Sequence, residues 1–114
     1  QKSQAELDRD AERVVTLFRA LTVRSMGTTD MRGQHDAMNK WIFDRDKDKD
    51  GKEIPQFTRG TIQMDYDDLE KGLGMVYKTF GWDEKTGAPT KATLEALGMR
   101  EVAAGLGSMG LLPA

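Results

Sequence analysis

Residues 65–99 read DYDDLEKGLGMVYKTFGWDEKTGAPTKATLEALGM, and this stretch decides the fold class. Asp65 is a good helix N-cap, and the two aspartates that follow Tyr66 suit the first turn of a helix. Apolar residues then recur three and four positions apart, at Leu69, Leu73, Val76, Tyr77 and Phe80. The spacing predicts a helix over 66–80, ended by Gly81, that is the central packing element and buries the Tyr77 ring.

The second half of the same stretch predicts a turn and a shorter helix. Thr86 and Gly87 provide a chain reversal, and Pro89 fixes the exit from it. Thr90 then caps a short helix that carries Leu94 and Leu97. Gly98 ends this helix, and the next residue, a methionine, can pack back onto it.

Toward the N-terminus, a long helix is predicted over Gln4–Ser25, with Gly27 as its stop. One apolar stripe, which we expect to face the core, is formed by Leu7, Ala11, Val14, Val15, Phe18 and Leu21. Most of the remaining helix surface is polar and consists of Arg9, Asp10, Arg13, Thr16 and Arg24. The pattern is typical of an amphipathic helix with one buried side.

Between these segments, a polar link over Thr28–Gln34 leads to a predicted helix over Asp36–Phe43. Residues 44–64 lack helical periodicity and are predicted to form one long irregular loop. A last apolar stretch over Glu101–Leu106 runs into residues 105–114, a flexible or docking tail. The sequence therefore predicts an all-α fold, a small bundle of about four helices, with residues 1–114 forming a single domain.

Composition excludes several classes of function. The net charge of −2, with acids and bases interspersed, offers no basic footprint for nucleic acid or for an anionic membrane surface. No apolar run is long enough to span a bilayer. The chain has no cysteine, which excludes a disulfide, a thiolate nucleophile and a cysteine-ligated zinc or iron–sulfur cluster. We expect a cytoplasmic protein.

One half-motif resembles a metal loop. Asp46, Asp48 and Asp50, followed by Gly51, match the opening of an EF-hand calcium loop at positions one, three, five and six. Position twelve, which needs a bidentate Glu, is Phe57. A solvated Asp/Lys loop is favoured over a calcium site, and any affinity for calcium should be at best millimolar.

No catalytic constellation is present either. His35, the single histidine, stands next to Asp36, but neighbours on a helix point about 100° apart. A surface or interface histidine is the favoured interpretation. The aromatic residues are assigned to core or interface packing rather than to a binding platform. We therefore predict no catalytic, cofactor-binding or metal-binding residue, apart from the weak calcium candidates.

The order of motifs in residues 65–99 resembles the C-terminal signature of the aldehyde ferredoxin oxidoreductase family. The matching elements are an aromatic residue in the helix, a Gly-Trp-Asp step, a Gly-x-Pro-Thr turn and a Leu-Gly-Met ending, here Tyr77, Gly81–Asp83, Gly87–Thr90 and Leu97–Met99. Upstream, residues 11–19 resemble the family's Arg-bearing helix, and Gly27, Asp30 and Arg32 resemble its polar link. The resemblance covers about residues 10–104.

The resemblance implies a tungsten held by two pterins and a 4Fe-4S cluster held by four cysteines in the parent enzyme. This chain has no cysteine, and its three Gly-Leu pairs lack the Asp of an Asp-x-x-Gly-Leu pterin motif. The expected function is thus a C-terminal helical domain that supports cofactor-bearing domains. The parent would oxidise an aldehyde to a carboxylate and pass electrons to ferredoxin or an electron-transfer subunit.

Two alternatives stay open at this point. Within the family, the parent could be a benzoyl-CoA reductase-type catalytic subunit. From a different class, the chain could be an independent helical interaction module or a calcium-responsive one. The family interpretation also predicts a contact face for the upstream domains of the same enzyme, with candidate residues Met75, Met99, Leu106, Met109, Leu111 and Leu112.

Overall fold

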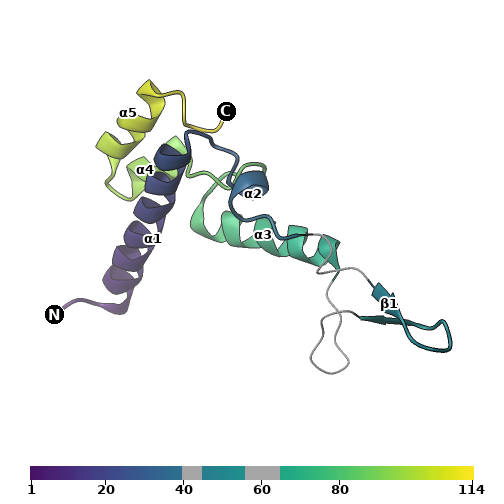
Figure 1. The fold of residues 1–114 in the computed structure, drawn as a ribbon. Helices are drawn as coiled ribbons and strands as arrows, with labels where there is room; N and C mark the ends of the chain where they lie inside the picture. The colour runs from purple at the N-terminus through teal and green to yellow at the C-terminus, as the bar shows by residue number, and fades with distance from the viewer. Residues whose placement is uncertain (40–44, 56–64) are drawn as a thin grey trace.

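The computed structural model describes residues 1–39, 45–55 and 65–114. The helices and strands in these ranges are α1 Gln4–Met26, α2 Met31–Gln34, β1 Arg45–Lys47, β2 Glu53–Pro55, α3 Tyr66–Phe80, α4 Lys91–Ala96 and α5 Arg100–Ser108 (Figure 1). The predicted all-helical class is confirmed, with one small hairpin added to it. The aromatic residues Trp41, Phe43 and Phe57 lie outside the described ranges.

The boundaries of the three clearest helices follow from their caps. The Ser3 hydroxyl accepts a hydrogen bond from the Glu6 N–H at the start of α1, and Gly27 ends that helix with φ 68°. The Asp65 N–H donates to the Asp68 carboxylate at 3.1 Å at the start of α3. The Thr90 hydroxyl caps α4 by accepting from a backbone N–H in its first turn. Local side-chain chemistry thus sets these ends.

The second helix is shorter and earlier than predicted. It spans Met31–Gln34, where a polar link was expected, because the Asp30 carboxylate accepts from the Gly33 N–H at 3.0 Å and caps it. Residues 35–39 are not helical, so the helix predicted over Asp36–Phe43 is wrong there, and its last four residues lie outside the described ranges. The Asp36 side chain is bound by two distant residues instead.

A β-hairpin occupies part of the segment predicted to be irregular. β1 and β2 pair antiparallel, with Asp46 opposite Ile54 and Lys47 opposite Glu53. At the turn, the Asp48 carboxylate accepts the Asp50 N–H and the Lys52 N–H, both at 2.9 Å. Each strand has only three residues, too few for an alternating pattern to show in the sequence.

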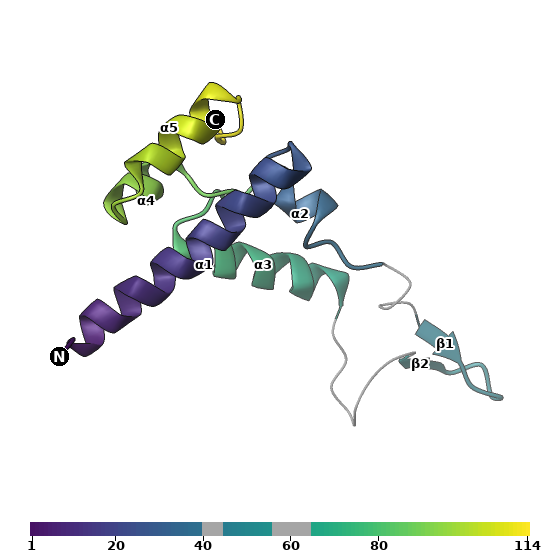
Figure 2. The same ribbon diagram turned by 60° about the vertical axis from the view of Figure 1, so that its left-hand side comes forward.

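The apolar core lies where the C-terminal half of α1 meets α4, α5 and the chain end (Figure 2). Its buried members are Ala20, Val23, Met31, Ala88, Leu94, Leu97, Met99, Ala103, Leu106 and Leu111. From α3, Tyr77 is the residue that becomes buried among those described, and it lies outside this apolar cluster. The expectation that α3 is the central packing element is therefore wrong, although the Tyr77 ring is fully buried as predicted.

The buried face of α1 is also the opposite of the predicted one. Its buried residues are Thr16, Ala20 and Val23, while the apolar stripe predicted to face the core is exposed. Phe18 keeps 67% of its surface exposed, and Val14 keeps 53%. The N-terminal end of α1 extends beyond the other helices in both ribbon views (Figures 1 and 2).

The shape is elongated for a chain of this length. The Cα radius of gyration is 18.3 Å, and the principal extents are 60 × 37 × 19 Å. A compact domain of this size would have a radius of gyration of about 13 Å. The hairpin and the free end of α1 project in different directions (Figure 1).

Candidate functional site

A cluster of polar side chains forms around Asp36, which tertiary contacts bring together from three parts of the chain. The Tyr77 hydroxyl donates to Asp36 Oδ2 at 2.5 Å. Arg19 Nη1 lies 3.0 Å from the same oxygen and 3.1 Å from Oδ1. The side chains of Arg19 and Asp36 are 13% and 12% exposed, so this ion pair is largely removed from water. We call these three residues the Asp36 cluster.

The protonation state of the cluster follows from these contacts. Burial alone would raise the pKa of the Asp36 carboxyl, but the hydrogen bonds from Tyr77, Arg19 and His35 outweigh burial and bring that pKa below its ordinary value. Burial and the adjacent Asp36 carboxylate raise the pKa of Tyr77 well above the ordinary tyrosine value. At neutral pH Asp36 is therefore a carboxylate and Tyr77 a neutral phenol.

Trp82 connects this cluster to α1. The Arg19 guanidinium lies 4.5 Å from the centre of the Trp82 ring, a cation–π distance. The Trp82 indole N–H donates to the Thr16 hydroxyl at 3.2 Å in a buried contact. Phe80 also stacks on Trp82, with the centroids of the two rings 4.9 Å apart. These bonds explain why two polar residues of α1 face inward.

Arg32, in α2, contacts both α3 and the turn that follows α3. Its Nη1 lies 2.7 Å from Glu70 Oε2, and its Nε and Nη2 donate to the Glu84 carbonyl at 3.1 and 2.9 Å. The guanidinium also lies 5.0 Å from the centre of the Tyr77 ring. Arg32 thus holds α2, α3 and the following turn against one another.

These contacts act as a structural clamp between α1 and α3. Among the described residues, no buried side-chain nitrogen or oxygen lacks a hydrogen-bond partner. A carboxylate held by an arginine and by a tyrosine with a raised pKa has little driving force to exchange protons near neutral pH. The geometry supports a structural role in joining α1 to α3.

His35 lies closer to Asp36 than expected. Its Nδ1 is 2.7 Å from Asp36 Oδ1, although the argument from helix geometry places such neighbours apart. That argument fails because the backbone at His35 has φ −121° and ψ −49°, just past the end of α2. The His35 side chain remains 48% exposed, as a surface histidine would be.

The calcium candidates lie on the hairpin. Asp46 belongs to β1, while Asp48 and Asp50 lie in the turn between the strands. The Asp48 carboxylate is used by the backbone of that turn, and Gly51 adopts φ 77° within it. Within residues 1–39, 45–55 and 65–114, no three His, Cys, Asp or Glu side chains are grouped so that they could hold a metal ion. Turn chemistry thus accounts for Asp48.

The predicted contact face is only partly correct. Met75 and Met109 are exposed, at 71% and 53%. Met99, Leu106 and Leu111 are wrong candidates, because they belong to the chain's own core, and Leu112 packs against that core half-buried. The apolar stripe of α1 is exposed instead. Beside it, a groove of about 300 Å³ lies between α1 and α5.

Sequence reasoning identified Tyr77 as a buried residue but gave no role to Arg19 or to Asp36. One signal was present, because Arg19 stands directly before Ala20 on the face that Thr16 and Val23 share. A cation placed on a face of small residues indicates a buried partner for it. Which residue would be that partner could not be read from the sequence.

Comparison with known families gives one match. Residues 1–99 match the family model described as aldehyde ferredoxin oxidoreductase, domains 2 & 3. The chain belongs to this family. The matched part of this aldehyde ferredoxin oxidoreductase family chain contains α1 to α4 and the whole Asp36 cluster, whereas α5 lies beyond it. The family resemblance predicted from the Gly-Trp-Asp and Gly-x-Pro-Thr motifs is therefore confirmed.

Two further findings concern solved structures and membrane-spanning helices. No solved structure gives a significant match to the chain. Over the described residues, none of the helices combines the length and the apolar character that crossing a membrane requires.

Proposed function

We propose that this chain is a helical C-terminal domain of a tungsten-pterin, iron–sulfur oxidoreductase. The complete protein would oxidise an aldehyde to a carboxylate in the cytoplasm and transfer the electrons to ferredoxin. The observation that carries the proposal is the family match over residues 1–99. The name of the matching family refers to the oxidation of aldehydes and to ferredoxin. This chain contains a part of that family's fold.

The residues of this chain do not fit the cofactors themselves. An iron–sulfur cluster needs thiolate ligands, and the chain has no cysteine. The described residues also offer no group of three metal-ligating side chains. The proposed role of this domain is therefore mechanical support of the cofactor-bearing domains, and no step of the reaction is assigned to it.

The exposed apolar stripe of α1 favours a role in holding neighbouring domains. Monomeric proteins rarely leave a contiguous apolar stripe on a helix open to water, so a partner surface is expected. The Asp36 cluster attaches α1 to α3 through Arg19 and Tyr77, and the Trp82–Thr16 bond attaches α1 to the turn after α3. A rigidly held helix can present a fixed apolar surface to a neighbouring domain.

The test is to isolate the native protein with antibodies raised against residues 1–114. We expect a polypeptide of several hundred residues that contains tungsten and iron and reduces an artificial electron acceptor in the presence of an aldehyde. A native species of 12.7 kDa without either metal would overturn the proposal and favour an independent module. A large native protein with neither metal would equally contradict it.

A further inference from the structure

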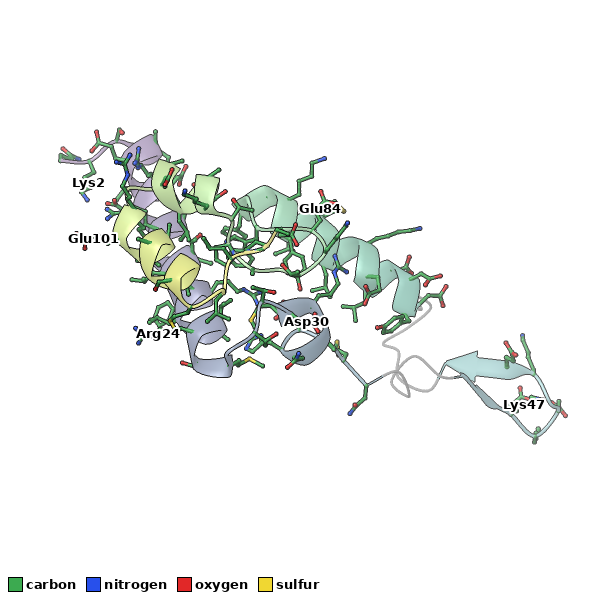
Figure 3. All side chains as sticks on the ribbon, turned by 90° about the horizontal axis from the view of Figure 1, so that it is seen from above. Lys2, Arg24, Asp30, Lys47, Glu84 and Glu101 are labelled. Carbon is green, nitrogen blue, oxygen red and sulfur yellow. The ribbon has the colours of Figure 1, made fainter. Side chains whose placement is uncertain are left out.

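The turn of the hairpin contains an Asp–Gly step, formed by Asp50 and Gly51. It is the one place in the sequence where a glycine follows an aspartate. At such a step the main-chain nitrogen of the glycine can attack the aspartate carboxyl readily, because glycine has no side chain to obstruct the approach. Both residues are exposed, and the hairpin that carries Lys47 lies apart from the helices (Figure 3). Water therefore reaches a step that is chemically reactive.

Three hydrogen bonds to Asp48 hold this step in a closed turn. The Gly51 N–H donates to the Asp48 carbonyl at 3.0 Å. The Asp48 carboxylate accepts the Asp50 N–H and the Lys52 N–H, both at 2.9 Å. While its N–H is held by a carbonyl, the Gly51 nitrogen can neither lose its proton nor turn toward the Asp50 carboxyl. The reaction therefore requires the turn to open first.

The hairpin opens at a low cost in free energy. β1 and β2 have three residues each, and a two-stranded hairpin of this kind is at best marginally stable in water. Segments with exposed main-chain hydrogen bonds open locally, without unfolding of the whole protein. The turn can thus open while the helices stay folded, and the Asp50–Gly51 step then becomes available for reaction.

We propose that Asp50 is a site of spontaneous conversion to isoaspartate, at a rate that Asp48 controls. In the open turn, the Gly51 nitrogen forms a bond to Cγ of Asp50, and one water leaves, made of a carboxyl oxygen and hydrogen with the amide proton. A second water then opens the five-membered ring. Attack on the main-chain carbonyl breaks its bond to the Gly51 nitrogen and leaves isoaspartate, whereas attack on Cγ restores aspartate. No oxidant or cofactor takes part, and the inference is independent of the proposed oxidoreductase function.

The product does not rebuild the same turn. Isoaspartate adds one methylene carbon to the main chain between Asp48 and Gly51, and its free carboxylate is attached directly to Cα. The added carbon displaces the Gly51 N–H from the Asp48 carbonyl, so the bond of 3.0 Å is lost. Conversion at Asp50 therefore leaves the hairpin turn open and changes the position of one negative charge.

The first experiment ages the complete protein at neutral pH and physiological temperature. Samples are digested with a protease that cleaves before aspartate but not before isoaspartate. We expect cleavage before Asp50 to decline with time, with no change in the mass of the peptide. Cleavage before Asp48 should persist, because that residue lies in the same turn but is followed by Lys49, whose side chain obstructs the attack. Undiminished cleavage before both residues would overturn the proposal.

The second experiment uses variants and counts the methyl groups added by a methyltransferase specific for isoaspartate. Asp50→Glu should reduce this labelling to background, since the longer side chain would have to close a six-membered ring, which is slow. Asp48→Ala should raise the rate of labelling several-fold, because the turn loses two hydrogen bonds. Asp67→Ala, which removes an exposed carboxylate from α3, is the control and should match wild type. Labelling that persists in Asp50→Glu, or an Asp48→Ala rate equal to wild type, would refute the inference.

Discussion

Asp36 shows how a single residue joins distant parts of this chain. Its carboxylate binds Arg19 of α1 and Tyr77 of α3, and its neighbour His35 contacts it from the other side. Since both strong partners are largely buried, they depend on Asp36 to satisfy their polar groups. One residue just past α2 therefore determines how α1 and α3 are held.

At neutral pH, Asp36→Asn should lower the free energy of unfolding by about 2–3 kcal/mol, because hydrogen bonds to a charged group are lost. The pKa of Asp36 is lowered in the folded state, so the contribution of its charge is present above the unfolded pKa and is lost as pH falls through the folded pKa. The difference between wild type and variant should therefore shrink below about pH 4. Urea unfolding between acid and neutral pH measures it.

The control is Asp67→Asn, which removes an exposed carboxylate from the first turn of α3. Its cost should stay below about 1 kcal/mol, the usual size of a helix-dipole effect. If Asp36→Asn costs no more than this control, the clamp is not a stabilising feature.

At the scale of elements, the turn between α3 and α4 is fitted against the Tyr77 ring. Gly87 adopts φ 76°, and a Cβ at this position would lie 2.7 Å from Tyr77 Cζ. Gly98, which ends α4, has nearly the same backbone angle, φ 77°, with no atom within 4 Å of its Cβ position. Substituting each of the two glycines therefore separates the cost of backbone strain from the cost of steric overlap.

Gly98→Ala should cost about 1–2 kcal/mol, the strain of a left-handed residue with a side chain. Gly87→Ala should cost at least about 1 kcal/mol more, because the turn must also move away from Tyr77. Thermal or urea unfolding of both variants measures the difference. Equal losses would show that the turn is free to shift away from the ring.

The hairpin is a second element whose sequence suggests a ligand. Its Asp48 carboxylate is already bound to two N–H groups of the turn, and the EF-hand pattern lacks its closing Glu. We expect calorimetry to find no calcium site tighter than about millimolar, the range of the weakest calcium modules. A micromolar site that Asp48→Ala abolishes would contradict this prediction.

At the scale of the whole molecule, the shape is elongated and the apolar stripe of α1 is exposed to solvent. The isolated chain should bind a hydrophobic dye, and the double variant Val14→Ser, Phe18→Ser should bind less of it. Because both side chains are exposed, the double variant should unfold within about 1 kcal/mol of wild type. Unchanged dye fluorescence would place the dye-binding apolar surface elsewhere, and a large loss of stability would show that the α1 stripe belongs to the core.

The sequence by itself determined where α1, α3 and α4 begin and end, but not the position of α2. The start of α1, both ends of α3 and the cap of α4 depend on residues within a few positions, such as Asp65, Gly81 and Thr90. Such local hydrogen bonds and backbone preferences are present in the sequence pattern itself. The family could be predicted for a similar reason, because its motifs lie close together in residues 81–99.

Only the tertiary structure decided which face of α1 is buried. Periodicity favoured the side with Phe18, yet the fold buries Thr16 and Arg19, because Trp82 and Asp36 bond to them. The bond from Trp82 to Thr16 spans 66 positions of sequence, so no local pattern contains it. Polar residues become stable inside a protein when distant partners satisfy them, and those partners come from parts of the chain that a local pattern does not include.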